Sequence, residues 1–144
     1  MRTIRRMTES DLDQVCAIEQ ATFSDPWSRA SFAKAITEPT DIYLVCDVNG
    51  EIAGYCGLWG VAGEGQITNV AVKDTFRRQG IGEEMLTRLL AEGREKDLNA
   101  YTLEVRVSNE SAIRLYHRLG FADAGIRKRF YTHPTEDALI MWIV

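Results

Sequence analysis

The segment Arg77-Arg78-Gln79-Gly80-Ile81-Gly82 combines basic side chains with two glycines, as anion-binding loops do. Glycine lets the backbone bend so that successive N–H groups face one concave surface. A helix that begins at the end of this segment adds unpaired N–H donors and the partial positive charge of its N-terminus. We therefore expect an anion to bind here, and a diphosphate suits such a surface.

Two common nucleotide-binding motifs do not fit this loop. A P-loop requires Lys followed by Ser or Thr, and no such pair follows Gly82. The dinucleotide fingerprint G-x-G-x-x-G fails because Met85 stands where the third glycine is needed. From the residues alone, the glycines could also serve turn geometry only, and this alternative remains open.

Two further side chains could move protons, but their patterns also fit ordinary structural roles. Glu104 lies on the polar side of the alternating segment 100–107, which by itself indicates a carboxylate on a solvated strand face. Tyr116 lies on the apolar face of the next helix and reads as a core tyrosine. Asn109 reads as the cap of that helix.

Hydrophobic periodicity predicts the elements that must position these residues. Strands are predicted over 3–7, 42–48, 52–59, 66–72, 100–107, 121–127 and 138–144, and helices begin near Thr8, Ser28, Gly80 and Ser108-Asn109. Asn49-Gly50 predicts a tight hairpin, Gly60, Gly63 and Gly65 predict a loose connection, and Gly120 ends the last helix. The order β-α-α-β-β-β-α-β-α-β-β predicts an α/β fold: a mixed, mostly antiparallel sheet with helices on both faces.

Length and composition limit the classes of protein. A chain of 144 residues supports one domain, residues 1–144, and 45% hydrophobic residues suffice for a packed core. The 17 basic and 21 acidic residues give a net charge of −4, which argues against generic nucleic-acid binding. No apolar run reaches the roughly 18 residues of a membrane helix, and the start lacks the apolar stretch of a signal peptide. We expect a soluble, cytoplasmic protein.

The thiols and imidazoles do not form a catalytic or metal-binding pattern. Cys16, Cys46 and Cys56 contain no C-x-x-C pair and are expected to be free thiols that pack as small hydrophobic residues. His117 is expected to be exposed on a helix, and His133, before a proline, to serve loop geometry. We therefore expect neither a Cys/His enzyme nor a zinc site, and no metal.

The glycine loop in its context resembles the coenzyme A pyrophosphate loop of the GNAT acetyltransferases. The strand Asn69-Val70-Ala71-Val72 precedes it and an amphipathic helix follows. The stretch from Leu103-Glu104-Val105-Arg106 to Leu119-Gly120-Phe121 resembles the second half of the same fold. The order of elements agrees from 3 to 144, and the combination is most similar to the RimI-type ribosomal-protein-alanine N-acetyltransferases.

This resemblance implies acetyl-CoA as the co-substrate and assigns residues to it. The strand before the loop splays from its neighbour in this family, so that its backbone holds the pantetheine arm. The implied coenzyme-binding residues are Val70, Ala71, Val72, Arg77, Arg78, Gln79, Gly80, Ile81, Gly82, Glu83, Asn109 and Tyr116. Glu83 departs from the pattern, because a carboxylate repels a diphosphate, and we expect its side chain to turn outward.

The resemblance also implies the acid and the base. An α-amino group has a pKa of about 7.7–8.0 and must lose a proton before it attacks a thioester, so a base is required. Glu104 is implied as this general base, directly or through water. Tyr116 is implied as the general acid that protonates the departing thiolate.

Two aromatic residues are implied to flank the acceptor, namely Trp27 and Tyr131. Asp25 precedes Pro26-Trp27 where RimI-type sequences have an apolar residue, and Phe130 stands where a tyrosine is common. The leading hypothesis is transfer of an acetyl group to the N-terminal alanine of a small-subunit ribosomal protein, by a monomer or weak dimer that binds no nucleic acid or membrane. The alternatives are a small amine, an antibiotic or a lysine side chain as the acceptor, and a non-catalytic acyl-CoA-binding sensor.

Overall fold

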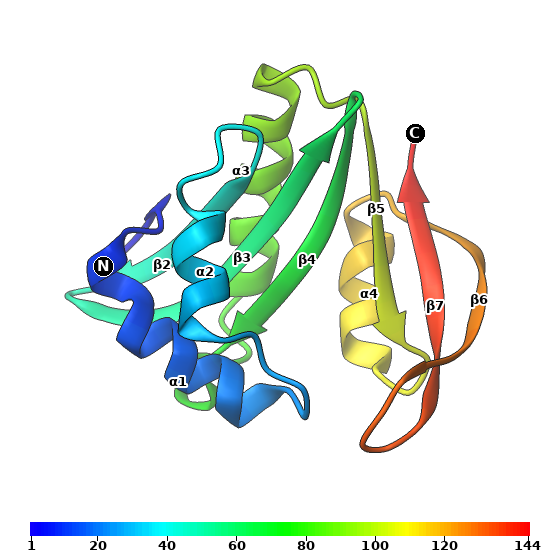
Figure 1. Cartoon of the computed structure of the whole chain (residues 1–144), viewed down its shortest axis with the longest axis horizontal. Helices are drawn as coiled ribbons and strands as arrows, with labels where there is room; N and C mark the ends of the chain where they lie inside the picture. Colours follow the sequence, from blue (N-terminus) through cyan, green and yellow to red (C-terminus); the bar gives the residue numbers. More distant parts are fainter.

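Seven strands form one sheet in the order β1-β2-β3-β4-β5-β7-β6 in the computed structural model, which describes residues 1–144 (Figure 1). The strands are β1 (Arg2–Arg6), β2 (Ile42–Val48), β3 (Glu51–Val61), β4 (Glu64–Val72), β5 (Ala100–Arg106), β6 (Ala122–Tyr131) and β7 (Glu136–Ile143). The helices are α1 (Leu12–Thr22), α2 (Arg29–Ala35), α3 (Ile81–Glu95) and α4 (Glu110–Arg118). Only β4 and β5 pair in parallel, so the predicted mixed, mostly antiparallel α/β fold and its element order are confirmed.

Helices cover both faces of the sheet and divide the core into two layers. On one face, α1 and α2 bury Leu12, Val15 and Phe32 against the sheet. On the other face, α3 and α4 pack through residues such as Met85 and Tyr116. The strands β2 and β3 are buried on both faces, which explains why they read as nearly continuous apolar runs rather than as alternating patterns. None of the helices has the length and apolar character that crossing a bilayer requires.

The start of the first helix differs from the prediction. The sequence predicts a helix from Thr8, but Glu9–Asp11 forms a 3-10 turn and α1 begins at Leu12. Thr8 and Asp11 form a capping box around that turn. The predicted cap is therefore correct, and the predicted geometry of the first turn is not.

The predicted loose connection between the third and fourth strands is wrong. The strands β3 and β4 continue to a tight turn at Ala62 and Gly63, whose φ angles are 52° and 80°. Gly60 and Gly65 are strand residues, and a Cβ atom at Gly65 would lie 2.8 Å from the ring of Tyr101. These two glycines permit close packing of the sheet rather than a turn.

The strands β4 and β5 separate soon after they meet. They pair only over Glu64–Gln66 and Ala100–Thr102, and Figure 1 shows them diverging toward the end of β4. The register of β4 against β3 also shifts next to Thr68, and such a bulge bends a strand. The sheet therefore opens between its two halves, as the resemblance implied.

Candidate active site

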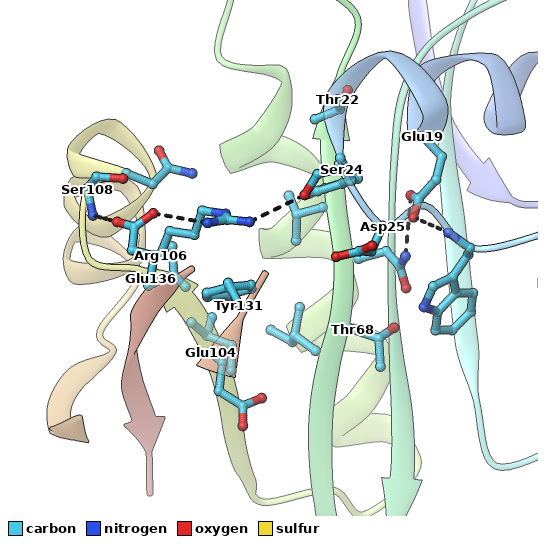
Figure 2. A pocket seen from close by; sticks show the side chains of 18 of the residues that line it. Glu19, Thr22, Ser24, Asp25, Thr68, Glu104, Arg106, Ser108, Tyr131 and Glu136 are labelled. Carbon is cyan, nitrogen blue, oxygen red and sulfur yellow. Dashed lines mark hydrogen bonds and ion pairs between the residues drawn. The ribbon is translucent and has the colours of Figure 1, made fainter. Parts of the chain in front are cut away.

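The opening between β4 and β5 forms a cleft of about 590 Å³. Its walls come from the α1–α2 segment, β4, β5, the start of α4 and the β6–β7 loop (Figure 2). The predicted site residues that line it are Trp27, Val70, Glu104, Asn109, Tyr116 and Tyr131. Ala71, Val72 and the glycine loop do not line this cleft. The structure thus brings together the implied acid, base and acceptor-flanking residues.

Glu104 faces this cleft instead of lying on a solvated strand face. Its side chain is only 16% exposed, and its Oε2 atom lies 3.1 Å from Nη1 of Arg127 on β6. The alternation along β5 is as predicted, with Tyr101, Leu103 and Val105 buried on the opposite side. The polar face of β5 is thus a wall of the cleft, which the alternation alone did not show.

Tyr116 is almost fully buried, with 7% exposure, and lies edge-on to the ring of Phe121. Burial raises the pKa of its hydroxyl well above the usual value, and the neighbouring Tyr131 adds to this effect. The hydroxyl therefore remains protonated throughout the physiological pH range and can act as a proton donor. Asn109 caps α4 by accepting a hydrogen bond from the Ala112 N–H (3.3 Å), so its structural role is present.

The glycine loop presents a run of free backbone donors. The N–H groups of residues 78–83 make no hydrogen bond within the protein, and the helical pattern resumes with the Glu84 N–H bonding to the Gly80 carbonyl. Arg78 and Gly80 take left-handed conformations, with φ angles of 64° and 76°. The carboxylate of Glu83 pairs with Arg118 on α4 (3.2 Å). These features leave a concave surface of N–H groups suited to an anion.

Two arginines hold the backbone around this loop. Arg77 donates from Nε to the Val72 carbonyl (3.1 Å) and pairs with Asp74 (2.9 Å). Arg2, on β1, donates to the Gln79 carbonyl (2.9 Å). The role of Arg2 could not be predicted from the sequence, because no local pattern links it to a loop 77 residues away.

Arg106, for which the sequence predicted no role, organises the β6–β7 loop. Its guanidinium lies 4.5 Å from the centre of the Tyr131 ring. It donates to the carbonyls of Thr132 (2.9 Å) and Pro134 (3.0 Å) and pairs with Glu136 (3.1 Å). The sequence did carry one signal for a role in the site, because the alternation along β5 places Arg106 on the same polar face as Glu104. Burial and the nearby Glu104 charge raise the pKa of Tyr131 to about 12.

The α1–α2 segment contacts the same loop from across the cleft. Asp25 accepts hydrogen bonds from the hydroxyl of Thr132 (2.7 Å) and from the imidazole of His133 (3.3 Å). The hydrogen bond from Thr132, and then that from His133, lowers the pKa of Asp25. Asp25 thus joins two segments far apart in the sequence, and this polar role explains a carboxylate at that position.

A buried polar cluster on the β4 side of the cleft was also missed. The Glu19 carboxylate, 2% exposed, accepts hydrogen bonds from the Tyr55 hydroxyl, the Trp27 N–H (2.9 Å) and Nδ2 of Asn69 (3.4 Å). The sequence did carry a signal, since residue 19 continues the buried stripe of Leu12 and Val15 along α1. A glutamate in such a stripe indicates a buried polar contact.

Comparison with known proteins supports the family resemblance. The model of the acetyltransferase (GNAT) family matches residues 12–121. A Bacillus subtilis protein, provisionally named a ribosomal protein bS18-alanine N-acetyltransferase, is 44% identical over 141 residues, which cover 97% of this chain and 93% of the relative. The ribosomal protein bS18-alanine N-acetyltransferase of Escherichia coli is 37% identical over 145 residues, which cover 98% of this chain and 96% of the relative.

Solved structures agree with this assignment. The crystal structure of the ribosomal-protein-S18-alanine N-acetyltransferase from Escherichia coli has a TM-score of 0.90 and 35% identity, covering 99% of this chain and 93% of that one. The structure of yncA from Salmonella typhimurium with acetyl-CoA has a TM-score of 0.86 and 20% identity, and the match covers 99% of this chain and 93% of that one. This similarity shows a shared fold. On the family match and these full-length relatives, the chain belongs to the GNAT family of acetyltransferases.

Proposed function

We propose that this protein transfers an acetyl group from acetyl-CoA to the α-amino group of a protein N-terminus, with the N-terminal alanine of ribosomal protein bS18 as the acceptor. The names of the relatives similar over the full chain support this acceptor. The observation that carries the proposal is the cleft itself, which opens where β4 and β5 diverge and holds Glu104 and Tyr116 together.

The chain has a fitting place for each part of acetyl-CoA, which would supply the acetyl group as a thioester. The free N–H groups of residues 78–83 would bind the diphosphate. The backbone of Val70, Ala71 and Val72, which lacks a β5 partner, would hold the pantetheine arm. Asn109 would add a side-chain hydrogen bond at the start of α4.

Glu104 and Tyr116 would then move the protons. Glu104, directly or through water, takes a proton from the α-ammonium group and so frees the nitrogen lone pair for attack. The C–N bond forms as the C–S bond breaks, and the Tyr116 hydroxyl protonates the departing sulfur. The second proton that the nitrogen loses as the amide forms restores the Tyr116 hydroxyl, so that only the proton on Glu104 is released to solvent. Trp27 and Tyr131 flank the acceptor, and the net charge of −4 suits a basic peptide.

The test incubates the protein with acetyl-CoA and a peptide that begins Ala-Arg-Tyr, and follows both free thiol and peptide mass. We expect one thiol released for each acetylated peptide. The matched control is the same peptide with a blocked α-amine and an added lysine, and a panel of small amines runs in parallel. Acetylation of the lysine or of a small amine alone would contradict the proposal, as would coenzyme binding without turnover on any amine.

A further inference from the structure

Glu19 and Asn69 form a buried polar pair on one wall of the cleft, opposite Glu104 and Tyr131. Figure 2 shows Glu19 on one side of the cleft and these two residues on the other. Glu19 and Asn69 are 2% and 4% exposed, respectively. Neither takes part in the proton transfers proposed for Glu104 and Tyr116.

The carboxylate of Glu19 has hydrogen-bond donors but no cation. Its three partners are the Tyr55 hydroxyl, the Trp27 N–H and the Asn69 amide, all of them neutral. It makes no salt bridge, whereas other poorly exposed carboxylates such as Asp11 and Glu92 pair with arginines. Burying a carboxylate without a counter-charge is costly, so a cation that enters the cleft would improve its environment.

The orientation of the Asn69 amide follows from this carboxylate. A carboxylate only accepts hydrogen bonds, so the nitrogen of Asn69 must face Glu19 and the oxygen must face the other way. That oxygen, Oδ1, is buried and has no hydrogen-bond partner. Buried acceptors without partners are rare, and this one belongs to a residue that lines the cleft.

We propose that Asn69 and Glu19 form the subsite that receives the primary ammonium group of the acceptor before its proton is removed. The ammonium group would donate a hydrogen bond to Oδ1 of Asn69 and bring the missing positive charge near Glu19. Asn69 is the binding residue, and Glu19 is a positioning residue that fixes the amide and supplies the charge. Glu104, on the opposite wall, remains the base. This inference rests on the proposed function, because it names the group recognised in the same cleft.

The test measures binding without turnover. Calorimetric titrations use the protein saturated with coenzyme A and two peptides of equal shape, one beginning with alanine and one beginning with a propionyl group, which lacks the ammonium. We expect the wild type to bind the alanyl peptide at least about tenfold more tightly, as a charged hydrogen bond provides. Asn69→Leu and Glu19→Gln are each expected to reduce this preference to less than about threefold, while coenzyme A binds unchanged.

Controls separate charge and positioning from general damage. Glu92→Gln removes the same charge far from the cleft and is expected to keep the preference. Asn69→Leu also removes a hydrogen-bond donor from the buried Glu19 carboxylate and is expected to lower the Tm, so unchanged affinity for coenzyme A serves as its folding control. Asn69→Ser replaces it if the leucine variant does not fold. The double variant Glu19→Gln with Asn69→Asp moves the carboxylate to the cleft-facing position and is expected to restore the preference.

The inference is overturned if the wild type shows no preference for the alanyl peptide, or if the preference survives Asn69→Leu. An equal loss of peptide and coenzyme A binding in the Asn69 variants would also overturn it, since that indicates a structural role. A wild type that shows the preference but acetylates no peptide would instead refute the proposed function and leave the ammonium subsite standing.

Discussion

Replacement of Arg106 by methionine removes the side chain that anchors the β6–β7 loop while keeping much of its apolar stem. Arg106 connects β5 to Thr132, Pro134 and Glu136 and covers the ring of Tyr131. If Tyr131 flanks the acceptor, the loop must be ordered before a peptide can bind. The substitution is therefore expected to raise the KM for the peptide and to leave the KM for acetyl-CoA unchanged.

The size of the effect follows from the interactions that the substitution removes. Three hydrogen bonds from a charged donor disappear, namely those to Thr132, to Pro134 and, at 3.4 Å, to the Ser24 hydroxyl, together with one ion pair and one cation–π interaction. Each such hydrogen bond contributes about 1.5–3 kcal/mol when well shielded, and the cation–π interaction about 0.5–1 kcal/mol. The side chains of Arg106 and Glu136 are 25% and 17% exposed, so solvent screening reduces the total. We take about 2 kcal/mol as the free energy by which the ordered loop is destabilised. This corresponds to an increase of about 30-fold in the KM for the peptide.

The assay is steady-state acetylation with each substrate varied in turn, for the wild type, Arg106→Met and Arg106→Lys. The lysine variant keeps the charge but not the planar fork, so its KM is expected to lie between the other two. Arg29→Met is the matched control, because Arg29 makes one exposed ion pair, with Asp13, away from the loop. A peptide KM within about twofold of the wild type in Arg106→Met, a change below about 0.4 kcal/mol, would refute this role for Arg106.

Three further predictions concern the catalytic groups and the packing of the sheet. Glu104→Gln is expected to lower kcat by at least about 100-fold at pH 7, and a near-normal kcat would show that Glu104 is not the base. Because burial raises the pKa of Tyr116, the kcat/KM profile is expected to rise with deprotonation of the acceptor near pH 8 and then to stay level to pH 10; a decline with a midpoint below pH 10 would contradict this assignment. Gly57→Ala is expected to destabilise the protein by about 1–3 kcal/mol in chemical denaturation, because the added methyl group would overlap the ring of Tyr43. Gly125→Ala meets no atom within 4 Å and serves as its control, so equal losses in both variants would contradict a packing origin.

Patterns that lie within one element were readable from the sequence. The alternation along 100–107 predicted β5 and its two faces, and Gly120 was correctly predicted to end the last helix, where its φ is 104°. Gly60 and Gly65 were misread as turn residues because a glycine that permits close packing has the same sequence signature as one that permits a turn. Only the position of Tyr101 in the folded sheet separates the two cases.

The site was predictable where it uses local motifs and hidden where it depends on contacts between distant segments. The glycine loop and Glu104 stand within recognisable stretches. The partner of Glu104 is Arg127 on another strand, and the loop around Tyr131 is held by Arg106. The polar contacts of Glu19 come from three other segments of the chain. No local pattern encodes such meetings, because they arise only when the sheet assembles.

The separation of β4 from β5 gives one strand two kinds of backbone amide. β4 pairs with β3 along its length but with β5 only over Glu64–Gln66. Along residues 69–72, alternate N–H groups therefore point toward β3, while those between them point to the side that β5 leaves unpaired. Hydrogen exchange is therefore expected to be slow for the first set and fast for the second. A molecule that settles in the cleft as a substitute strand would slow only the second set, so this strand reports occupancy residue by residue without any turnover.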